Sequence, residues 1–377
     1  MGVLSGLRII EIAGIGPAPF CGMLLADMGA ELILVERSGG RAGDPHELGD
    51  QAIVHRGKRS LALDLKDRRA IDALLVLIDG ADGLIEGMRP GVMERLGLGP
   101  AVCMARNPRL AYGRMTGWGQ HGPLAQAAGH DLNYIALSGA LWYAGAPGAP
   151  PLAPPTLVGD IGGGALYLAM GMLAAMLHVR NGGAGQVIDA AIVDGSANMM
   201  NLLLSVHGAG QMPFQRGTGI LDGPHWYASY TCADGHCITV GALEPQFYAL
   251  LLAKLDLQDD ADFKRPYDPR CWPAVRAKLA ALFLSQPCLH WCELLEGSDA
   301  CFAPVLTPAE AMAHPHMAAR GIYQQHDGLL QAAPAPRFSG AAQAGPGKVP
   351  RRGEHGADVL RAAGFGDAEI AALMPAP

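Results

Sequence analysis

The first 36 residues constrain the fold more than any other stretch of the chain. Residues 7–12 and 31–36 are apolar runs typical of buried strands, and residues 19–29 between them have the leucine spacing of a helix that ends in glycine. A strand, a helix and a second strand in this order require a parallel sheet with a right-handed crossover. The sequence therefore predicts an α/β protein.

The turn after the first strand bears on a dinucleotide site. It contains Gly14 and Gly16, and Glu36 lies about where a ribose-binding acid would stand. However, Pro19 occupies the position of the third glycine in the dinucleotide fingerprint. Because a partial match of this kind is weak, a nicotinamide or flavin cofactor is not predicted.

Length and composition indicate two domains. A chain of 377 residues exceeds one simple core, and 50% apolar with only 6% aromatic residues suits an α/β protein better than a β-sandwich. Further strands are predicted at 60–65, 83–86, 110–117 and 185–192, and helices at 68–79 (capped by Asp67), at 165–180 and from Asp194 to about Val206. A hairpin of strands at 227–232 and 237–240 begins a smaller α+β domain. The predicted boundaries are residues 1–200 with 345–377 for the large domain, 201–224 for a linker, 225–310 for the small domain and 311–344 for a second linker.

Charge and signals limit the partners. A net charge of −7 argues against nucleic acid as a ligand. The longest apolar run, residues 165–179, is too short to span a bilayer, and neither a cleavable N-terminal signal nor a C-terminal peroxisomal signal is visible. The eight cysteines have no repeated spacing, so neither disulfides nor a metal site is expected. We expect a cytoplasmic protein with no membrane partner.

Basic residues recur at the predicted strand ends and in the loops that follow them. They are Arg37, Arg56, Lys58, Arg59, Arg89 and Arg114. The carboxyl ends of parallel strands form the edge where ligands bind in an open sheet, and arginine suits the geometry of phosphate. The pattern indicates either a polyphosphate ligand or scattered surface charge.

Two ionisable residues stand out in residues 129–164. His130 and Asp160 each follow a glycine, and Asp160 precedes Ile161, three further glycines and a predicted helix. This is the pattern of an acidic N-cap, and the N–H groups of residues 161–163 would be free to bind an oxyanion. A histidine and a carboxyl group in one pocket can act as base and acid on opposite faces of a carbon. The residue types alone leave open an interior histidine and a plain helix cap.

Short motifs along nearly the whole chain point to one family. They are Leu25–Ala30, Val35–Arg37, Arg56–Lys66, Arg89–Met93, Gly117–Gln120 and Gly185–Asp189. Together they resemble the CaiB/BaiF, or class III CoA-transferase, superfamily. Two more specific segments, Gly129–Tyr134 and Gly241–Tyr248, resemble its α-methylacyl-CoA racemase branch.

The resemblance implies a fold and a ligand. The fold would be a Rossmann-like large domain, built from the N-terminal part and the C-terminal tail, with a smaller domain, two linkers and two chains interlocked as an obligate homodimer. The substrate would be an acyl-CoA thioester, in which CoA is part of the substrate and no separate cofactor is needed. The CoA-contacting residues would be Arg37, Ala62, Leu63, Asp64, Leu65, Arg89, Gly129, Asp131, Leu132, Asn133 and Tyr134.

The racemase branch implies a two-base reaction at the α-carbon of a 2-methylacyl-CoA. His130 would take the proton of one enantiomer, and protonated Asp160, with a pKa raised by burial, would deliver a proton to the other face of the enolate. Glu244 would orient the imidazole of His130. Asp131 is alternatively the acid itself or a residue that supports the site without reacting, and Glu244 with Pro245 is alternatively only the first turn of a helix.

Two other functions are compatible with parts of the pattern. A class III CoA transferase would use Asp160 as the nucleophile that accepts the acyl group. Asp160 is common to both reactions, whereas His130 and Glu244 favour the racemase. A non-catalytic protein that binds CoA or a nucleotide would leave His130 and Asp160 without a chemical role. The sequence does not predict the acyl chain.

Overall fold

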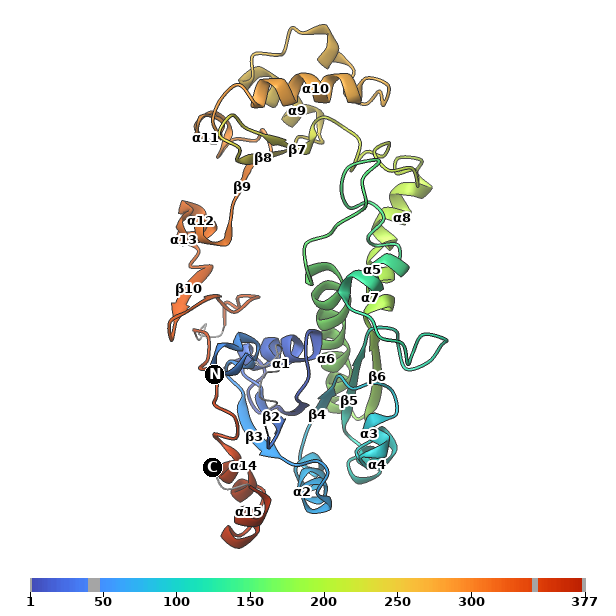
Figure 1. Cartoon of the computed structure of the whole chain (residues 1–377), viewed down its shortest axis with the longest axis vertical. Coiled ribbons are helices and arrows are strands. Elements are labelled where there is room, and N and C mark those ends of the chain that lie inside the picture. The colour runs from blue at the N-terminus through green and yellow to red at the C-terminus, as the bar shows by residue number, and fades with distance from the viewer. Residues whose placement is uncertain (1, 40–47, 341–344, 375–377) are drawn as a thin grey trace. The chain divides into compact units, whose positions relative to one another are not determined.

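The chain forms two compact units. The computed structural model describes residues 2–39, 48–340 and 345–374 (Figure 1). The first unit consists of Met1–Leu141, Ala153–Met199 and Ala319–Pro377, and the second of Trp142–Leu152 and Met200–Ala318. The chain thus leaves the first unit twice, at residues 142–152 and 200–318, and returns each time. The predicted linkers stay predictions.

A parallel sheet of six strands is the centre of the first unit. Its order is β3-β2-β1-β4-β5-β6, and every neighbouring pair is parallel. The strands are β1 (Arg8–Ile12), β2 (Glu31–Arg37), β3 (Arg59–Leu63), β4 (Gly83–Glu86), β5 (Ala111–Thr116) and β6 (Gln186–Ala191). The predicted Rossmann-like α/β fold is confirmed. The direction in which strands are added reverses between β1 and β4, and open sheets have a ligand crevice at such a point.

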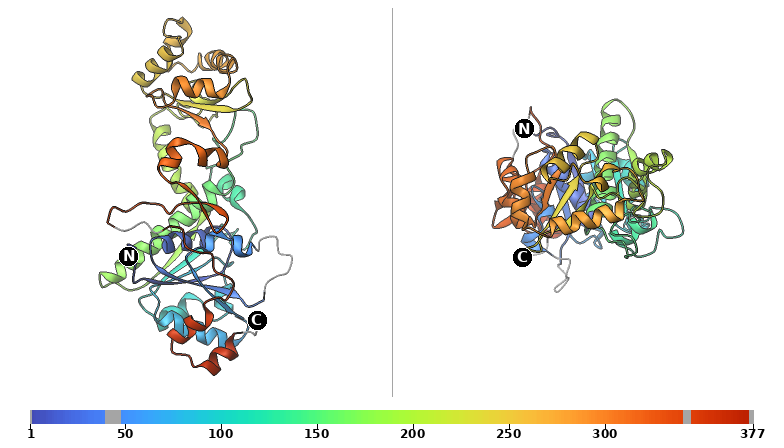
Figure 2. Two further views of the ribbon diagram at one scale, coloured as in Figure 1. Left: turned by 90° about the vertical axis from the view of Figure 1, so that its left-hand side faces the viewer. Right: turned by 90° about the horizontal axis from the view of Figure 1, so that it is seen from above.

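Helices cover both faces of this sheet (Figure 1, Figure 2). One face packs against α1 (Pro17–Asp27) and α6 (Leu166–Arg180). The other packs against α2 (Arg68–Asp79), α3 (Val92–Arg95), α4 (Pro100–Arg106), α14 (Gly356–Ala362) and α15 (Asp367–Leu373). Each buried leucine or isoleucine side chain in these layers contributes about 1.5–3 kcal/mol. Asp67 caps α2 as predicted, since its side chain accepts the N–H of Arg69 at 2.9 Å.

The helix that carries Asp160 begins earlier than predicted. Leu157–Ala165 (η3) forms a wide π-helical segment that continues into α6, so Asp160 lies in the first turn and is not an N-cap. The combined 24-residue helix is long and apolar enough to cross a bilayer. The prediction that this apolar segment is too short to span a bilayer is therefore wrong. Leu168 and Met172 are nevertheless buried against the sheet. That is the position of a core helix in a globular domain.

Glycines allow this helix to lie directly against α7 (Ile192–Met199). A Cβ added at Gly163 would lie 2.7 Å from the backbone nitrogen of Ser196 and 3.0 Å from the carbonyl oxygen of Ile192. Only glycine therefore fits at this contact. The single long helix predicted from Asp194 is wrong, because α7 ends at Met199 and α8 (Asn201–Gly208) follows it.

The C-terminal part of the chain completes the edge of the sheet. Residues Gly353 and His355 bond to Ser60 of the edge strand β3: Gly353 N–H donates to Ser60 Oγ at 2.7 Å, and His355 N–H donates to the Ser60 carbonyl at 2.9 Å. Arg56 donates to Gln331 Oε1 and to the carbonyl of Ala332, at 3.0 and 2.8 Å. Gly353 and His355 lie in the tail predicted to join the large domain, whereas Gln331 and Ala332 lie in residues 311–344, predicted as a linker. Residues 308–332, most of which lie in that predicted linker, are not without regular structure. They contain α12 (Pro308–Ala313), α13 (Pro315–Ala319) and an antiparallel hairpin of β10 (Tyr323–His326) and β11 (Leu329–Ala332).

The second unit is a small α+β fold, as predicted. Strands β7 (Tyr227–Thr231), β8 (Cys237–Gly241) and β9 (Phe302–Val305) form an antiparallel sheet. Helices α9 (Pro245–Lys254), α10 (Trp272–Phe283) and α11 (Cys288–Leu295) pack on it through an aromatic core that includes Trp226, Phe283 and Trp291.

Candidate active site

A cavity opens at the carboxyl ends of β1, β4 and β5 in the first unit. Its volume is about 470 Å³, within the range of small-molecule sites. It lies at the point where the strand order reverses, as expected for this type of sheet. Its walls are the turn after β1 (residues 15–17), the turn after β4 (87–90), the end of β5 (115–118) and the segment 125–130 apart from residue 126, together with Tyr134, Asp160 and Ile192.

His130 and Asp160 both line this cavity. His130 stands at the N-cap position of α5 (Asp131–Leu137), where its N–H donates to Asn133 Oδ1 at 3.0 Å. Its side chain is exposed. The helix start thus fixes the backbone of His130 and leaves the imidazole free to meet a ligand.

The environment of Asp160 favours its neutral form. Partial burial and the neighbouring carboxylate of Asp131 raise its pKa to about 6, against a smaller opposing effect of His130. The turn after β1 approaches the carboxyl group closely, because a Cβ at Gly16, where φ is +70°, would lie 3.6 Å from Asp160 Oδ2. A carboxyl group with this pKa can donate a proton near neutral pH.

Asp131 holds the start of the helix that carries Asp160. Its Oδ1 accepts the backbone N–H groups of Gly159 and Asp160, each at 2.8 Å, and the residue is almost fully buried. The structure thus places Asp131 in contact with the backbone of Asp160, and the choice between the roles open from the sequence stays a prediction. The carboxylate of Asp131 therefore binds two of the N–H groups in the first turn of this helix.

The predicted oxyanion site after Asp160 is wrong. The N–H group of Ile161 donates to the carbonyl of Thr156 at 3.0 Å, and those of the following glycines lie within the π-helical segment, where N–H groups bond five residues back. These groups are consumed by the helix because it begins at Leu157. The sequence does not predict the helix start at Leu157, because a run of glycines is more typical of a loop than of a helix.

Four of the six strand-end basic residues are bound to carboxylates. The shortest ion-pair distances are 2.6 Å for Arg56–Asp27, 2.7 Å for Lys58–Glu11, 2.6 Å for Arg59–Glu31 and 2.8 Å for Arg114–Glu94. Arg37 and Arg89 are exposed and, within the described parts of the chain, have no carboxylate partner. Of the six basic residues, only Arg37 and Arg89 therefore remain as predicted phosphate contacts among the described residues. Arg89 lines the cavity.

The other predicted CoA-contacting residues lie at two places in the first unit. Arg37 ends β2 opposite Leu63 of β3, and this strand end carries the predicted segment of Ala62, Leu63, Asp64 and Leu65. Ala62 and Leu63 are buried in the sheet, so their predicted contact with a ligand stays a prediction. Glu36, the conceivable ribose acid, bonds to Ser60 and is not free.

The second place is the start of α5. Gly129 and Tyr134 line the cavity beside His130, and the Tyr134 hydroxyl donates to the carbonyl of Gly129. Leu132 and Asn133 follow on the exposed side of the helix. Tyr134 also packs edge-on against Trp118, with ring centroids 4.7 Å apart. Sequence reasoning missed Trp118 as a wall of the cavity, although the motif Gly117–Gln120 had drawn attention to it.

Glu244 lies in the second unit, at the N-cap position of α9 with Pro245 as the first helical residue. Its side chain is exposed and makes no capping hydrogen bond. It is therefore available to another group, and its role toward His130 stays a prediction. Within the described residues, no group of three or more His, Cys, Asp or Glu side chains is arranged to hold a metal ion.

Comparisons with known proteins agree with this site. The sequence profile of CoA-transferase family III matches residues 4–356. The chain is 41% identical to "Alpha-methylacyl-CoA racemase" of Mus musculus over 98% of this chain and 96% of that protein, and 40% identical to the Homo sapiens protein of the same name over 97% and 95%. It is 30% identical to "Acetyl-CoA:oxalate CoA-transferase" of Acetobacter aceti over 90% of both chains.

Solved structures share the fold over nearly the whole chain. The crystal structure of a CAIB/BAIF family protein from Brucella suis superposes with a TM-score of 0.80 at 27% identity, covering 96% of this chain and 99% of that one. The fold, the cavity at the strand reversal and these matches agree, and the chain belongs to CoA-transferase family III, the CaiB/BaiF family.

Proposed function

We propose that this protein is a 2-methylacyl-CoA racemase, an isomerase that interconverts the (R) and (S) thioesters by exchange of the α-proton. The observation that carries the proposal is His130 and a carboxyl group of raised pKa, Asp160, in the walls of one cavity. The high identity to two racemases over nearly the full chain supports it. CoA is part of the substrate, and the reaction needs no further cofactor.

The reaction uses one proton acceptor and one proton donor. Neutral His130 removes the α-proton of one enantiomer and becomes the imidazolium, which leaves an enolate of the thioester. Protonated Asp160 then delivers its proton to the opposite face of the α-carbon and becomes the carboxylate. The reverse reaction uses the same groups in exchanged roles. With a pKa near 6, Asp160 carries its proton in about a tenth of the molecules at about pH 7.

The substrate would be held by its CoA part at Arg89 and Arg37, with contributions from the strand end at Ala62–Leu65 and from α5. Glu244 would bond to the imidazole of His130 and fix its orientation. We also propose a cytoplasmic location.

An obligate interlocked homodimer is the proposed assembly. The exposed face of α6 supports it, because Leu166, Met170 and Leu177 are each about half exposed or more. Val187 of the edge strand β6 is exposed as well. Apolar surface of this extent on a soluble domain marks an interaction site.

Deuterium exchange tests the reaction. A 2-methylacyl-CoA is incubated with the protein in D2O without an acceptor acid, and deuterium at the α-carbon is followed by NMR. The racemase exchanges the α-proton and inverts the centre, and His130→Ala loses inversion with an unchanged assembly. Absence of exchange, together with CoA transfer once an acceptor acid is added, would identify instead a class III CoA transferase in which Asp160 accepts the acyl group. CoA binding without either activity would identify a non-catalytic binding protein.

A further inference from the structure

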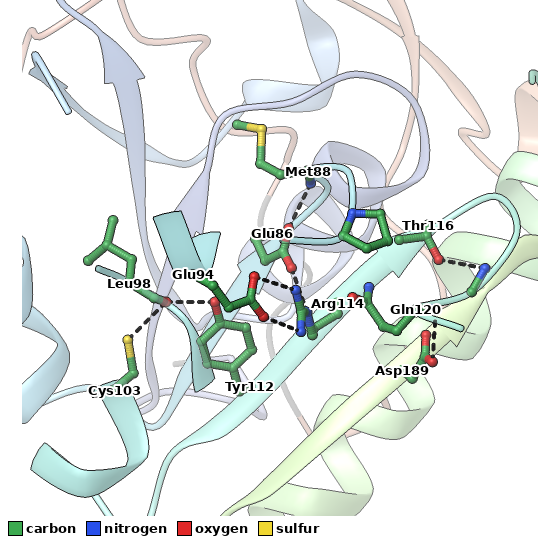
Figure 3. A network of polar contacts seen from close by, with 12 residues as sticks. Glu86, Met88, Glu94, Leu98, Cys103, Tyr112, Arg114, Thr116, Gln120 and Asp189 are labelled. Atoms are coloured by element: carbon green, nitrogen blue, oxygen red, sulfur yellow. Dashed lines mark hydrogen bonds and ion pairs between the residues drawn. The ribbon is translucent and has the colours of Figure 1, made fainter. Parts of the chain in front are cut away.

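A buried arginine, Arg114, precedes the cavity-lining residue Met115 and does not itself line the cavity. Figure 3 shows the polar contacts around it. Arg114 is only 7% exposed and stands near the end of β5, directly opposite Glu86 of β4. Its Nε donates to Glu86 Oε1 at 2.9 Å, and its Nη1 lies 2.8 Å from Glu94 Oε1 on α3. One guanidinium group therefore joins two carboxylates from different elements.

Glu86 connects this arginine to the turn that follows β4. The residue is fully buried, and while one carboxylate oxygen binds Arg114, the other accepts the backbone N–H of Met88 at 2.7 Å. A carboxylate bonded to a backbone N–H makes a charge-assisted hydrogen bond, about twice as strong as a neutral one. Glu86 thus holds the turn Gly87–Pro90 at its second residue.

All four residues of this turn line the cavity, and Arg89 is among them. The carbonyl of Pro90, the last residue of the turn, accepts Gln126 Nε2 at 3.1 Å, so the turn is also tied to the segment whose residues 125 and 127–130 line the cavity. The turn is held at Met88 and at Pro90, and Arg89 between them has no carboxylate partner among the described residues.

The second carboxylate is fixed from the same side of the sheet. Glu94 lies on the short helix α3, and the chain after it is held by Tyr112, whose hydroxyl donates to the carbonyl of Leu98 at 2.8 Å. Tyr112 and Arg114 alternate with Gly113 on β5 and therefore point to the same face. Figure 3 shows the bond between Tyr112 and Leu98 beside the ion pairs of Arg114.

We propose that Glu86, Arg114 and Glu94 form a positioning brace that fixes the turn Gly87–Pro90, so that Arg89 meets the phosphates of the CoA part of the substrate. The brace rests on the proposed acyl-CoA ligand. Burying an arginine with carboxylates seldom adds net stability, because desolvation offsets the attraction. Because Glu86 is bonded to a turn that lines the cavity, the brace instead serves ligand binding. The guanidinium of Arg89 must point in one direction to bind a phosphate, and a fixed turn keeps it in that direction.

A double-mutant cycle on coenzyme A binding tests the brace. The dissociation constant of coenzyme A is measured by calorimetry for the wild type, Arg89→Ala, Glu86→Gln and the double variant. Arg89→Ala should weaken binding roughly tenfold, the effect of one lost charge-assisted hydrogen bond. Glu86→Gln should weaken it several-fold, and the double variant should be no weaker than Arg89→Ala alone, because Glu86 acts through Arg89. Losses that multiply, or an unchanged affinity of Glu86→Gln, would overturn the proposal.

Kinetics separate positioning from a general loss of structure. In the exchange assay Glu86→Gln and Arg114→Met should raise KM and leave kcat close to the wild type, and Arg114→Lys should recover part of the affinity. A fall in kcat without a change in KM would contradict the brace. Arg106→Met is the matched control, because it removes a half-exposed ion pair with Asp79 away from the cavity and should leave both constants unchanged. If Glu86→Gln does not fold, Glu94→Gln removes the more exposed half of the brace and should give a smaller rise in KM.

The binding cycle and the exchange assay distinguish failure of the racemase from failure of the brace, provided that the wild type binds coenzyme A. A wild type that binds coenzyme A but exchanges no α-proton would refute the racemase, and the binding cycle would still decide on the brace. A wild type that does not bind coenzyme A refutes both.

Discussion

Asp160 derives its chemistry from neighbours that are distant in sequence. Asp131 precedes it by 29 positions and the turn at Gly16 by far more, yet both lie against it in the folded chain. The sequence alone picked out His130 and Asp160 through adjacent glycines and family motifs. It did not show that Arg56, Lys58, Arg59 and Arg114 are already paired, because the matching carboxylates come from other strands and helices.

Replacing Asp160 by asparagine should stabilise the protein while abolishing inversion. Folding raises the pKa of this carboxyl from 3.8 to about 6. The folded state therefore holds the proton more tightly, and stability falls as the pH rises from about 4 to about 6. At about pH 7.5 the ionised group destabilises the folded state by about 1 kcal/mol, once solvent screening at this half-buried site is allowed for.

Urea denaturation at a fixed protein concentration measures this effect. Asp160→Asn should have the higher free energy of unfolding at about pH 7.5 and lose that advantage near pH 4, where the wild type is also neutral. The exposed Asp259→Asn is the control and should show no such crossing. Equal stabilities of Asp160→Asn and wild type at both pH values would mean that folding does not disfavour the charge.

The elements were predicted with uneven success, and for physical reasons. Strands buried on both faces are continuous apolar runs, so β1, β4 and the others were placed to within a residue or two. The start of the helix at Leu157 was missed, because its glycines are explained only by contact with α7. The hairpin of β10 and β11 was missed because each strand has only four residues and the first of them is largely polar.

Gly163→Ala tests the contact between η3 and α7. The added methyl group would meet backbone atoms of Ser196 and Ile192, which cannot move aside alone, so the variant should lose about 2–4 kcal/mol of stability. Gly208→Ala in α8 is the matched helical control, since its Cβ would meet no other atom within 4 Å. It should change stability by less than about 1 kcal/mol. Thermal unfolding of both variants provides the measurement, and similar melting temperatures would show that the two helices separate easily.

At the scale of the whole molecule, the order of the chain separates the proposed catalytic groups. His130 and Asp160 belong to the first unit, whereas Glu244 belongs to the second. Composition and the domain pattern predicted an α/β unit and a smaller α+β unit. Only the family motifs suggested that Glu244 belongs to the site. The pattern of apolar residues could not do so, because periodicity describes single elements and not the arrangement of units.

The proposed dimer predicts the effect of a charge on α6. Met170 is 60% exposed in the single chain, and Met170→Glu should yield a monomer without exchange activity, because a carboxylate would be desolvated in the interface. Sedimentation measures the assembly. Val102→Glu, on the exposed side of α4, should remain a dimer. A dimeric and active Met170→Glu would remove this face from the interface.

The closure of β3 by the last residues of the chain has a consequence for biosynthesis. Ser60 must wait for Gly353 and His355, which are 293 and 295 positions further on, and at 5–20 residues per second a ribosome needs about 15–60 s to make them. During that time the nascent chain presents an open strand edge, the kind of surface that recruits other strands. The protein should thus emerge as a client of chaperones that shield such edges, and the pairing of Gly353 and His355 with Ser60 is the step that covers this edge.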